Sequence, residues 1–180
     1  MRTKSKLHSR ENKPKIYAFI DSQNLNLGVL SQNWKLDFGS FRKFLEDKYS
    51  VSKAFLFIGF IARNKSLYSK LKKDGYILVF KPVLEGKIKG QKQIKGNVDA
   101  ELVLHTMIEY PNYDQAIIVS GDGDFYCLID YLKKKNKLLK IITPNKRYSS
   151  LLRGFSNFIV PIVLFKDKLK QNQKRGIPAG

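Results

Sequence analysis

Short apolar runs alternate with longer amphipathic segments along most of the chain. The runs have the length and the β-branched or aromatic content of buried strands, and the segments between them carry apolar residues at helical spacing. The pattern predicts strands over residues 15–20, 53–60, 76–80, 115–119 and 138–142, an edge strand over 157–164, and helices over 38–49, 65–73, 97–110 and 125–134.

This alternation of strands and helices predicts an α/β fold. Strands that are joined through helices form a parallel sheet by right-handed crossovers, and the helices cover both of its faces. We expect one domain over 15–165 on a central, mainly parallel sheet of five to six strands, between basic tails over 1–14 and 166–180. The edge strand could pair two subunits as a homodimer, although Pro161 interrupts it.

One lysine-rich arm, residues 81–96, interrupts the alternation. It contains three glycines after Pro82, which favours a flexible arm or a short hairpin beside the third strand. Its lysines could bind successive phosphates of a nucleic acid, and a merely solvated loop is the alternative. The candidate RNA-binding residues are Lys87, Lys89, Lys92 and Lys95 of the arm, together with Arg63, Lys146 and Arg147.

The charge of the chain indicates which kind of partner it binds, and its cysteine content indicates the compartment in which it works. The chain has 34 Lys and Arg against 15 Asp and Glu, a net charge of +19, which favours a polyanionic partner such as nucleic acid. A single cysteine excludes a disulfide framework and favours a reducing, cytoplasmic location. No apolar run has the length of a membrane span, and the N-terminus lacks the apolar core of a secretory signal.

Four acidic residues fall where an α/β fold places its ligands. Asp21 follows the first predicted strand, Asp122 and Asp124 follow the fourth, and Asp99 opens the helix after the arm. If the first and fourth strands are neighbours, these acids meet at one edge of the sheet. Close carboxylates repel one another unless a cation lies among them, and oxygen ligands without histidine or cysteine favour Mg²⁺ or Mn²⁺. Such an ion can bind a phosphodiester and activate a water molecule.

Each acidic position also has a purely structural explanation. Asn24 could cap a helix after Asp21, Asp124 could cap a tight turn, and the helix dipole could favour Asp99. Acids at three separate strand ends are nevertheless improbable if all of them serve only as caps. Their joint occurrence therefore favours a metal site.

Other motifs that contain similar residues are excluded, because each of them requires a residue that this chain lacks. A calcium loop that starts at Asp122 would need a glutamate where Lys133 stands, and a dinucleotide fingerprint would need a glycine at Tyr126. A haloacid-dehalogenase phosphatase would need a second aspartate at Gln23. There is no nucleotide-phosphate loop, so no nucleotide cofactor is expected. The two histidines lie in the basic tail and in a predicted helix, which leaves a serine or cysteine hydrolase without a base.

Three segments resemble, in order, the motifs of the NYN domain family of PIN-like nucleases, which includes the LabA-type proteins. They are residues 19–25 (FIDSQNL), 95–102 (KGNVDAEL) and 118–125 (IVSGDGDF). The resemblance implies a Rossmann-like PIN fold and a metal-dependent ribonuclease site. The metal-binding residues that it implies are Asp21, Asp99, Asp122 and Asp124, with Asn24 orienting the first of them.

Members of this family often carry a further acid where the chain has His105, which leaves the number of bound metals open. Our leading hypothesis is an endoribonuclease that hydrolyses RNA phosphodiester bonds with a metal-activated water, leaving a 5′-phosphate and a 3′-hydroxyl. Two alternatives stay open: a non-catalytic RNA-binding or regulatory module, and a DNA nuclease of the same fold.

Overall fold

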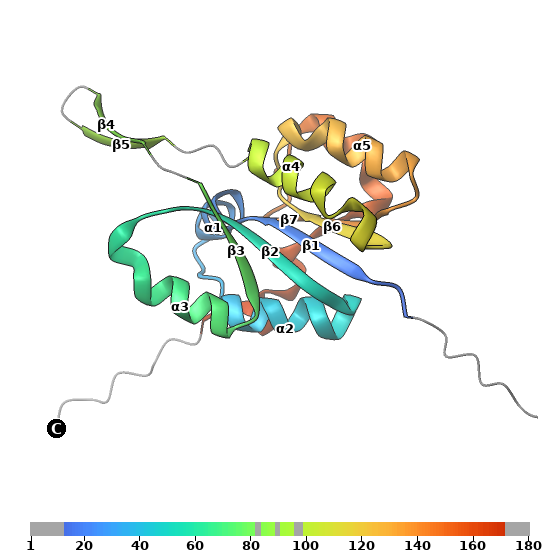
Figure 1. The fold of residues 1–180 in the computed structure, drawn as a ribbon, viewed down its shortest axis with the longest axis horizontal. Helices are drawn as coiled ribbons and strands as arrows, with labels where there is room; N and C mark the ends of the chain where they lie inside the picture. Colours follow the sequence, from blue (N-terminus) through green and yellow to red (C-terminus); the bar gives the residue numbers. More distant parts are fainter. Residues whose placement is uncertain (1–12, 82–83, 89–90, 96–98, 172–180) are drawn as a thin grey trace, which may run out of the picture.

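The computed structural model describes residues 13–81, 84–88, 91–95 and 99–171. Six strands form one sheet in the order β3-β2-β1-β6-β7-β8, and every neighbouring pair is parallel (Figure 1). The strands are β1 (Ile16–Asp21), β2 (Val51–Gly59), β3 (Tyr76–Lys81), β6 (Gln115–Val119), β7 (Leu138–Thr143) and β8 (Ile159–Pro161). The predicted α/β fold with a parallel sheet is confirmed.

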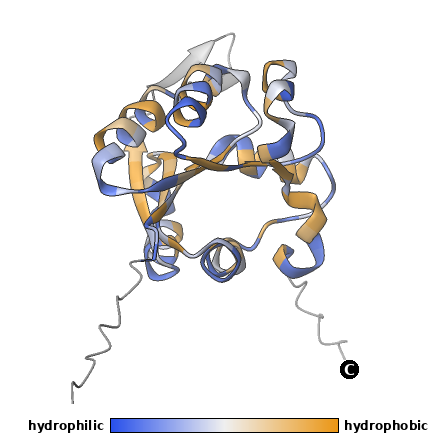
Figure 2. Cartoon of the chain, turned by 90° about the vertical axis from the view of Figure 1, so that its right-hand side faces the viewer, coloured by the Kyte–Doolittle hydropathy of each residue, from blue (hydrophilic) through white to orange (hydrophobic). Residues whose placement is uncertain are grey.

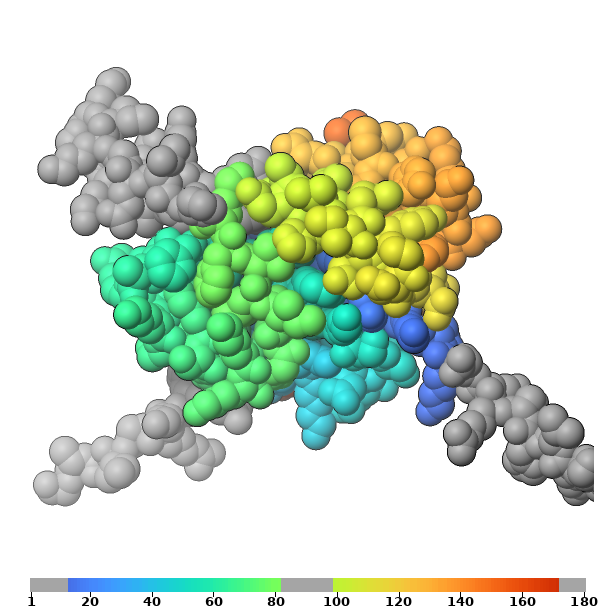
Figure 3. Space-filling model, in the orientation of Figure 1, coloured from blue at the N-terminus to red at the C-terminus, as the bar shows by residue number. Residues whose placement is uncertain are grey.

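Helices cover both faces of the sheet, as the view along it shows (Figure 2). One face carries α1 (Ser22–Leu30), α2 (Phe38–Tyr49), α3 (Lys65–Lys73) and α6 (Lys166–Leu169). The other carries α4 (Asp99–Ile108), α5 (Tyr126–Lys134) and the 3₁₀ helix η4 (Ser150–Phe158), with α4 and α5 side by side (Figure 3). Shorter 3₁₀ helices are η1 (Ala62–Asn64), η2 (Tyr110–Asn112), η3 (Gly123–Phe125) and η5 (Ile162–Phe165).

Two apolar cores lie on the two sides of the sheet. Along β1, Ala18 and Ile20 belong to the core under α1 and α2, whereas Tyr17 and Phe19 belong to the core under α4 and α5. This alternation follows from the two-residue period of a strand, and a strand that is buried on both faces therefore reads as an uninterrupted apolar run. None of the helices among the described residues is long and apolar enough to cross a bilayer.

Helix α1 was not among the helices that the sequence pattern predicted. Residues 22–30 form α1, although its only buried positions are Ser22, Leu25 and Val29. The N-cap is Asp21 rather than Asn24, because the Asp21 carboxylate accepts hydrogen bonds from the backbone N–H of Gln23 (3.1 Å) and of Asn24 (3.0 Å). A cap at the last residue of β1 lets the chain pass from strand to helix without a loop.

Predictions for the second half of the chain need correction. The edge strand expected over 157–164 shrinks to the three residues of β8, because η4 extends to Phe158 and η5 begins directly after Pro161. This edge therefore offers little backbone to a second subunit. Residues 166–169, expected in the tail, form α6 with Leu169 buried, and the Leu169 carbonyl accepts from the Asp37 N–H at 2.8 Å.

The lysine-rich arm forms a hairpin, as one of the two predictions for it stated. Its strands, β4 (Leu84–Ile88) and β5 (Gln91–Lys95), pair antiparallel with each other as a separate two-stranded sheet. The pairing places Lys87 opposite Lys92. The arm is thus not a seventh strand of the main sheet.

Helix α1 is held against the loop that follows β7. A Cβ atom at Gly28 would lie 2.4 Å from the Pro144 Cβ, so only glycine permits this approach. The Gln32 side chain donates to the Pro144 carbonyl at 2.9 Å, and the Asn145 amide donates to the Gly28 carbonyl at 3.2 Å. The loop after β7 is therefore fixed relative to the N-terminal helix.

We expect Gly28→Ala to destabilise the protein by about 1–3 kcal/mol, because the rigid Pro144 ring cannot yield to the added methyl group. The loss should appear although alanine favours a helix over glycine by about 1 kcal/mol. The matched control is Gly154→Ala in η4, where nothing lies within 4 Å of the added atom. Urea unfolding of both variants measures the difference, and equal midpoints would contradict the packing argument.

Candidate active site

The strand order brings the predicted acids to one edge of the sheet. Strand β1 pairs with β6, and Ile20 is in register with Val119, so Asp21 and Ser120 come next on neighbouring strands. The condition for the predicted cluster, that the first and fourth of the predicted strands be neighbours, is therefore met. Helix α4 begins with Asp99 and packs against β1 on the same side of the molecule as α5.

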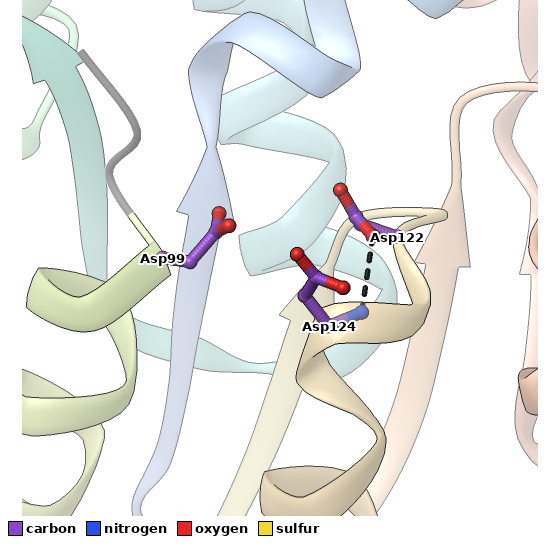
Figure 4. Close-up of side chains that lie close together, drawn as sticks. All are labelled: Asp99, Asp122 and Asp124. Carbon is purple, nitrogen blue, oxygen red and sulfur yellow. Dashed lines mark hydrogen bonds between the residues drawn. The ribbon is translucent and has the colours of Figure 1, made fainter.

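Three aspartates converge at this edge. Asp99 comes from the first turn of α4, Asp122 from the loop after β6, and Asp124 from η3, and their side chains extend into one space (Figure 4). One carboxylate oxygen of each lies within 4.8 Å of the others. Two oxygen ligands of a single Mg²⁺ can be up to about 4.2 Å apart, since each lies about 2.1 Å from the ion. The cluster thus has nearly the spacing of three ligands on one ion.

Asp21 lies beside this cluster and is buried, with 5% of its surface exposed. Its pKa is raised from 3.8 to about 6, mainly by burial and also by the nearby Asp99 and Asp122 carboxylates, whereas the N–H donors of Asn24 and Gln23 lower it. Within the described residues, no lysine or arginine forms an ion pair with Asp21, Asp122 or Asp124. The site thus concentrates negative charge in a strongly basic protein.

Hydrogen bonds fix the loop that carries two of the acids. The Asp122 N–H donates to the Ser120 hydroxyl (3.2 Å), and the Asp124 N–H donates to the Asp122 carboxylate (3.0 Å). The Ser149 N–H donates to the Gly121 carbonyl at 2.9 Å. A Cβ atom at Gly123 would lie 2.4 Å from the Ser149 hydroxyl oxygen. The glycines of this SGDGD segment therefore let the loop after β7 pack directly on the acidic turn.

The family resemblance implies that Asn24 orients Asp21. The Asn24 side-chain oxygen accepts from the Gly121 N–H at 2.9 Å, and only its backbone N–H reaches Asp21. Asn24 therefore ties α1 to the acidic loop and orients Asp21 through the main chain.

Ser120 and Ser149 belong to the site, although no sequence pattern predicted either of them as a site residue. The only signal for Ser149 was its suitability as the N-cap of η4, where its hydroxyl lies 3.4 Å from the Leu151 nitrogen. Ser120 is buried, and a serine directly after a buried strand is a common turn residue.

The cations proposed to bind RNA follow three strands at the same edge. Arg63 is exposed in η1 after β2, and Lys146 and Arg147 are exposed in the loop after β7. The backbones of Lys87, Lys92 and Lys95 lie in the hairpin after β3. Lys89 lies outside the described residues. Glu101, the second acid in the first turn of α4, is paired with Lys81 at 3.2 Å.

The family model for the NYN domain matches residues 15–164. The chain belongs to the NYN domain family. This is a family of PIN-like nuclease folds, and the match includes all four aspartates of this NYN domain. A comparison with curated proteins finds no match.

Two solved structures are similar to this NYN domain. A protein of unknown function from Vibrio parahaemolyticus, VPA0982, has a TM-score of 0.70 at 23% identity over 89% of this chain and 98% of its own. It supports the fold alone. The T5 5′-exonuclease with bound divalent zinc has a TM-score of 0.43 at 16% identity over 72% of this chain and 54% of its own, which is too remote to compare sites.

The raised pKa of Asp21 predicts a pH-dependent stability for the metal-free NYN domain. Between pH 4 and 6 the folded state holds a proton that the unfolded chain has released, so this contribution to stability is lost as the pH rises through about 6. Asp21→Asn keeps a good N-cap and should be more stable than the parent above pH 6, by up to about 3 kcal/mol.

Urea unfolding in EDTA between pH 4.5 and 7.5 measures this difference. The control is Asp37→Asn, since Asp37 caps α2 through the Ser40 N–H away from the site. Addition of Mg²⁺ should raise the unfolding midpoint of the parent more than that of Asp21→Asn. If the stability of the parent and that of Asp21→Asn depended on pH in the same way, the pKa of Asp21 would not be raised in the folded state.

Proposed function

We propose that this NYN domain is a divalent-metal-dependent endoribonuclease that hydrolyses phosphodiester bonds in RNA. The observation that carries the proposal is the convergence of Asp99, Asp122 and Asp124 within 4.8 Å, next to the buried Asp21. Membership of a PIN-like nuclease family supports it independently. The net charge of +19 favours a polyanionic substrate.

The donor set fits a hard divalent cation. All four candidate ligands are carboxylates, and neither a thiolate nor an imidazole belongs to the described cluster, which favours Mg²⁺ or Mn²⁺ over zinc. Asp99, Asp122 and Asp124 would hold the ion, and the buried Asp21 would lie next to them as a fourth candidate ligand. When bound, the ion would neutralise charge on the scissile phosphate and lower the pKa of a water molecule.

The residues of the chain itself hold and orient the reacting groups. Ser120 and Asn24 fix the loop that presents Asp122, so the carboxylates are positioned before substrate binds. Exposed cations at the same edge would attract the RNA backbone, which the four aspartates alone would repel. Hydrolysis by water in this manner leaves the ribose 2′-hydroxyl unused, so we expect 5′-phosphate and 3′-hydroxyl ends.

Incubation of labelled RNA and DNA with Mg²⁺, with Mn²⁺ or with EDTA tests the proposal. Cleavage of RNA that EDTA abolishes supports it. Preferential cleavage of DNA would assign the chain to the DNA nucleases of this fold, and binding without cleavage would assign it to regulatory RNA-binding modules.

We expect Asp122→Asn to lower metal-dependent cleavage by orders of magnitude while the protein remains folded. The asparagine oxygen can still accept the Asp124 N–H, and one source of repulsion among the acids disappears. The control is Asp130→Asn, which removes a surface ion pair with Lys134 on α5 and should change stability by less than about 0.5 kcal/mol. Initial rates on labelled RNA are the measurement, and near-normal rates in Asp122→Asn would refute the site.

The hairpin lysines should contribute to RNA affinity in a salt-dependent way. The register places Lys87 opposite Lys92 in the hairpin. Replacing Lys87, Lys89, Lys92 and Lys95 together by glutamine should lower the slope of log affinity against log salt by about 3, if each contacts one single-strand phosphate.

A quadruple variant with the same loss of charge elsewhere is the control for the hairpin variant. It replaces Lys43, Lys48, Lys72 and Lys73 of α2 and α3 by glutamine. Titration at several salt concentrations should leave its slope close to that of the parent. If the slope of log affinity against log salt were the same for the hairpin variant and the parent, RNA binding would be assigned to the tails or to Arg63, Lys146 and Arg147.

A further inference from the structure

A pocket of about 570 Å³ opens beside Asp21, between α1, α3 and the carboxyl end of β2. Small-molecule sites commonly have volumes of about 300–1,000 Å³, so the pocket can hold one unstacked base. It adjoins the site directly, since Ser22 and Gln23 line it and the Gln23 N–H donates to the Asp21 carboxylate. Asp21 also lies opposite Phe57 in β2, and Ile58 and Gly59, the next two residues, line the pocket.

The walls of the pocket are leucines that the fold leaves partly uncovered. Leu27, Leu30 and Leu67 line it, and they are 56%, 39% and 42% exposed. Large apolar side chains that gather at one exposed place mark a binding surface more often than a structural one. Apolar walls of this kind hold the faces of a nucleobase that has left its stack.

Most of the polar side chains that line the pocket are carboxamides. Gln23, Asn26 and Asn64 line it, and no hydrogen bond from the described part of the chain engages their side chains. A carboxamide carries both a donor and an acceptor, so it can pair with the hydrogen-bonding edge of a base. The pocket thus offers both kinds of contact that a base needs: apolar side chains against the faces of its ring and carboxamides that can form hydrogen bonds with its edge.

The charge around the pocket matches a nucleic acid strand. The lining contains no acidic residue and one cation, Lys35, while Arg63 and Lys65 flank Asn64 and are exposed. A protein partner that docked an apolar helix here would not need the carboxamides. A strand whose phosphates follow these cations would lead from the pocket to the aspartates.

We propose that this pocket binds an unstacked nucleobase of single-stranded RNA next to the phosphate that is cleaved, an inference that rests on the proposed nuclease function. A base must leave its helix to enter, so the pocket selects single strands over duplexes. The contacts are made to the base, so they add to the salt-dependent phosphate contacts without altering the salt slope.

The test uses the full chain in EDTA, where binding is separated from cleavage. The probes are a fluorescent single-stranded RNA of mixed sequence, its perfect duplex, and the same strand without bases. The pocket variant is Leu27→Gln with Leu67→Gln. The control is Leu104→Gln with Leu164→Gln, which changes leucines that are 58% and 64% exposed outside the pocket. Thermal unfolding of both variants establishes that they are folded.

We expect the pocket variant to bind the single strand roughly tenfold more weakly than the parent does. It should bind the duplex and the baseless strand as tightly as the parent does. The control should match the parent on all three probes. Asn26→Leu should change which bases flank the cleaved position in Mg²⁺, whereas Asn157→Leu, an exposed asparagine at the far edge of the sheet, should not. Unchanged single-strand affinity in the pocket variant, or an equal loss on the baseless strand, overturns the proposal.

Cleavage in Mg²⁺ separates this proposal from the proposed function. If the chain cuts no nucleic acid but loses single-strand affinity as described, the pocket proposal stands and the nuclease proposal fails. If the pocket variant cuts and binds RNA as the parent does, the nuclease proposal stands and the pocket belongs to another partner, such as an apolar peptide.

Discussion

Repulsion among four carboxylates at one edge of a parallel sheet is the constraint around which the rest of the structure is arranged. Asp21 is buried beside Asp99 and Asp122, and its pKa is raised to about 6 by burial and by their charge. Two N–H groups at the start of α1 partly offset this cost by donating to Asp21. Backbone donors serve this purpose better than a lysine would, because they stabilise the carboxylate without occupying the position that a cation would take.

The acidic site and the apolar pocket lie on different sides of β1, at the same end of the sheet. The acids lie where β1, β6 and α4 meet, and the loop after β7 packs on them through Gly121 and Gly123. The pocket lies on the other side of β1, under α1 and α3. Helix α1 connects both, because Asn24 bonds to the acidic loop and Leu27 lines the pocket. A rigid α1 would therefore hold a bound base at a fixed distance from the carboxylates.

The sequence predicts five of the six strands of the main sheet and the four helices α2, α3, α4 and α5 well, since buried parallel strands and amphipathic helices leave strong periodic signals. Helix α1 leaves a weak signal because it buries only Ser22, Leu25 and Val29. Asp21, Asp122 and Asp124 could be named from their places after strands and Asp99 from its place at the start of a helix, but their convergence depended on β1 lying beside β6, which no local pattern determines. The Asn24–Gly121 bond, the Ser149 contact and the pocket join segments far apart in the chain, and so they required the structure.

His105 stands where the family resemblance implies a further acid, and its place in α4 separates it from the acidic cluster. It lies six residues after Asp99, which is about 9 Å along α4 and about 120° around its axis. Its ring packs edge-on against Phe57 of β2, with ring centroids 5.8 Å apart. The cluster of carboxylates that lie within 4.8 Å of one another consists of Asp99, Asp122 and Asp124 and does not include this histidine. His105 therefore stands apart from the three clustered aspartates, and its contact with Phe57 belongs to the packing of α4 on the sheet.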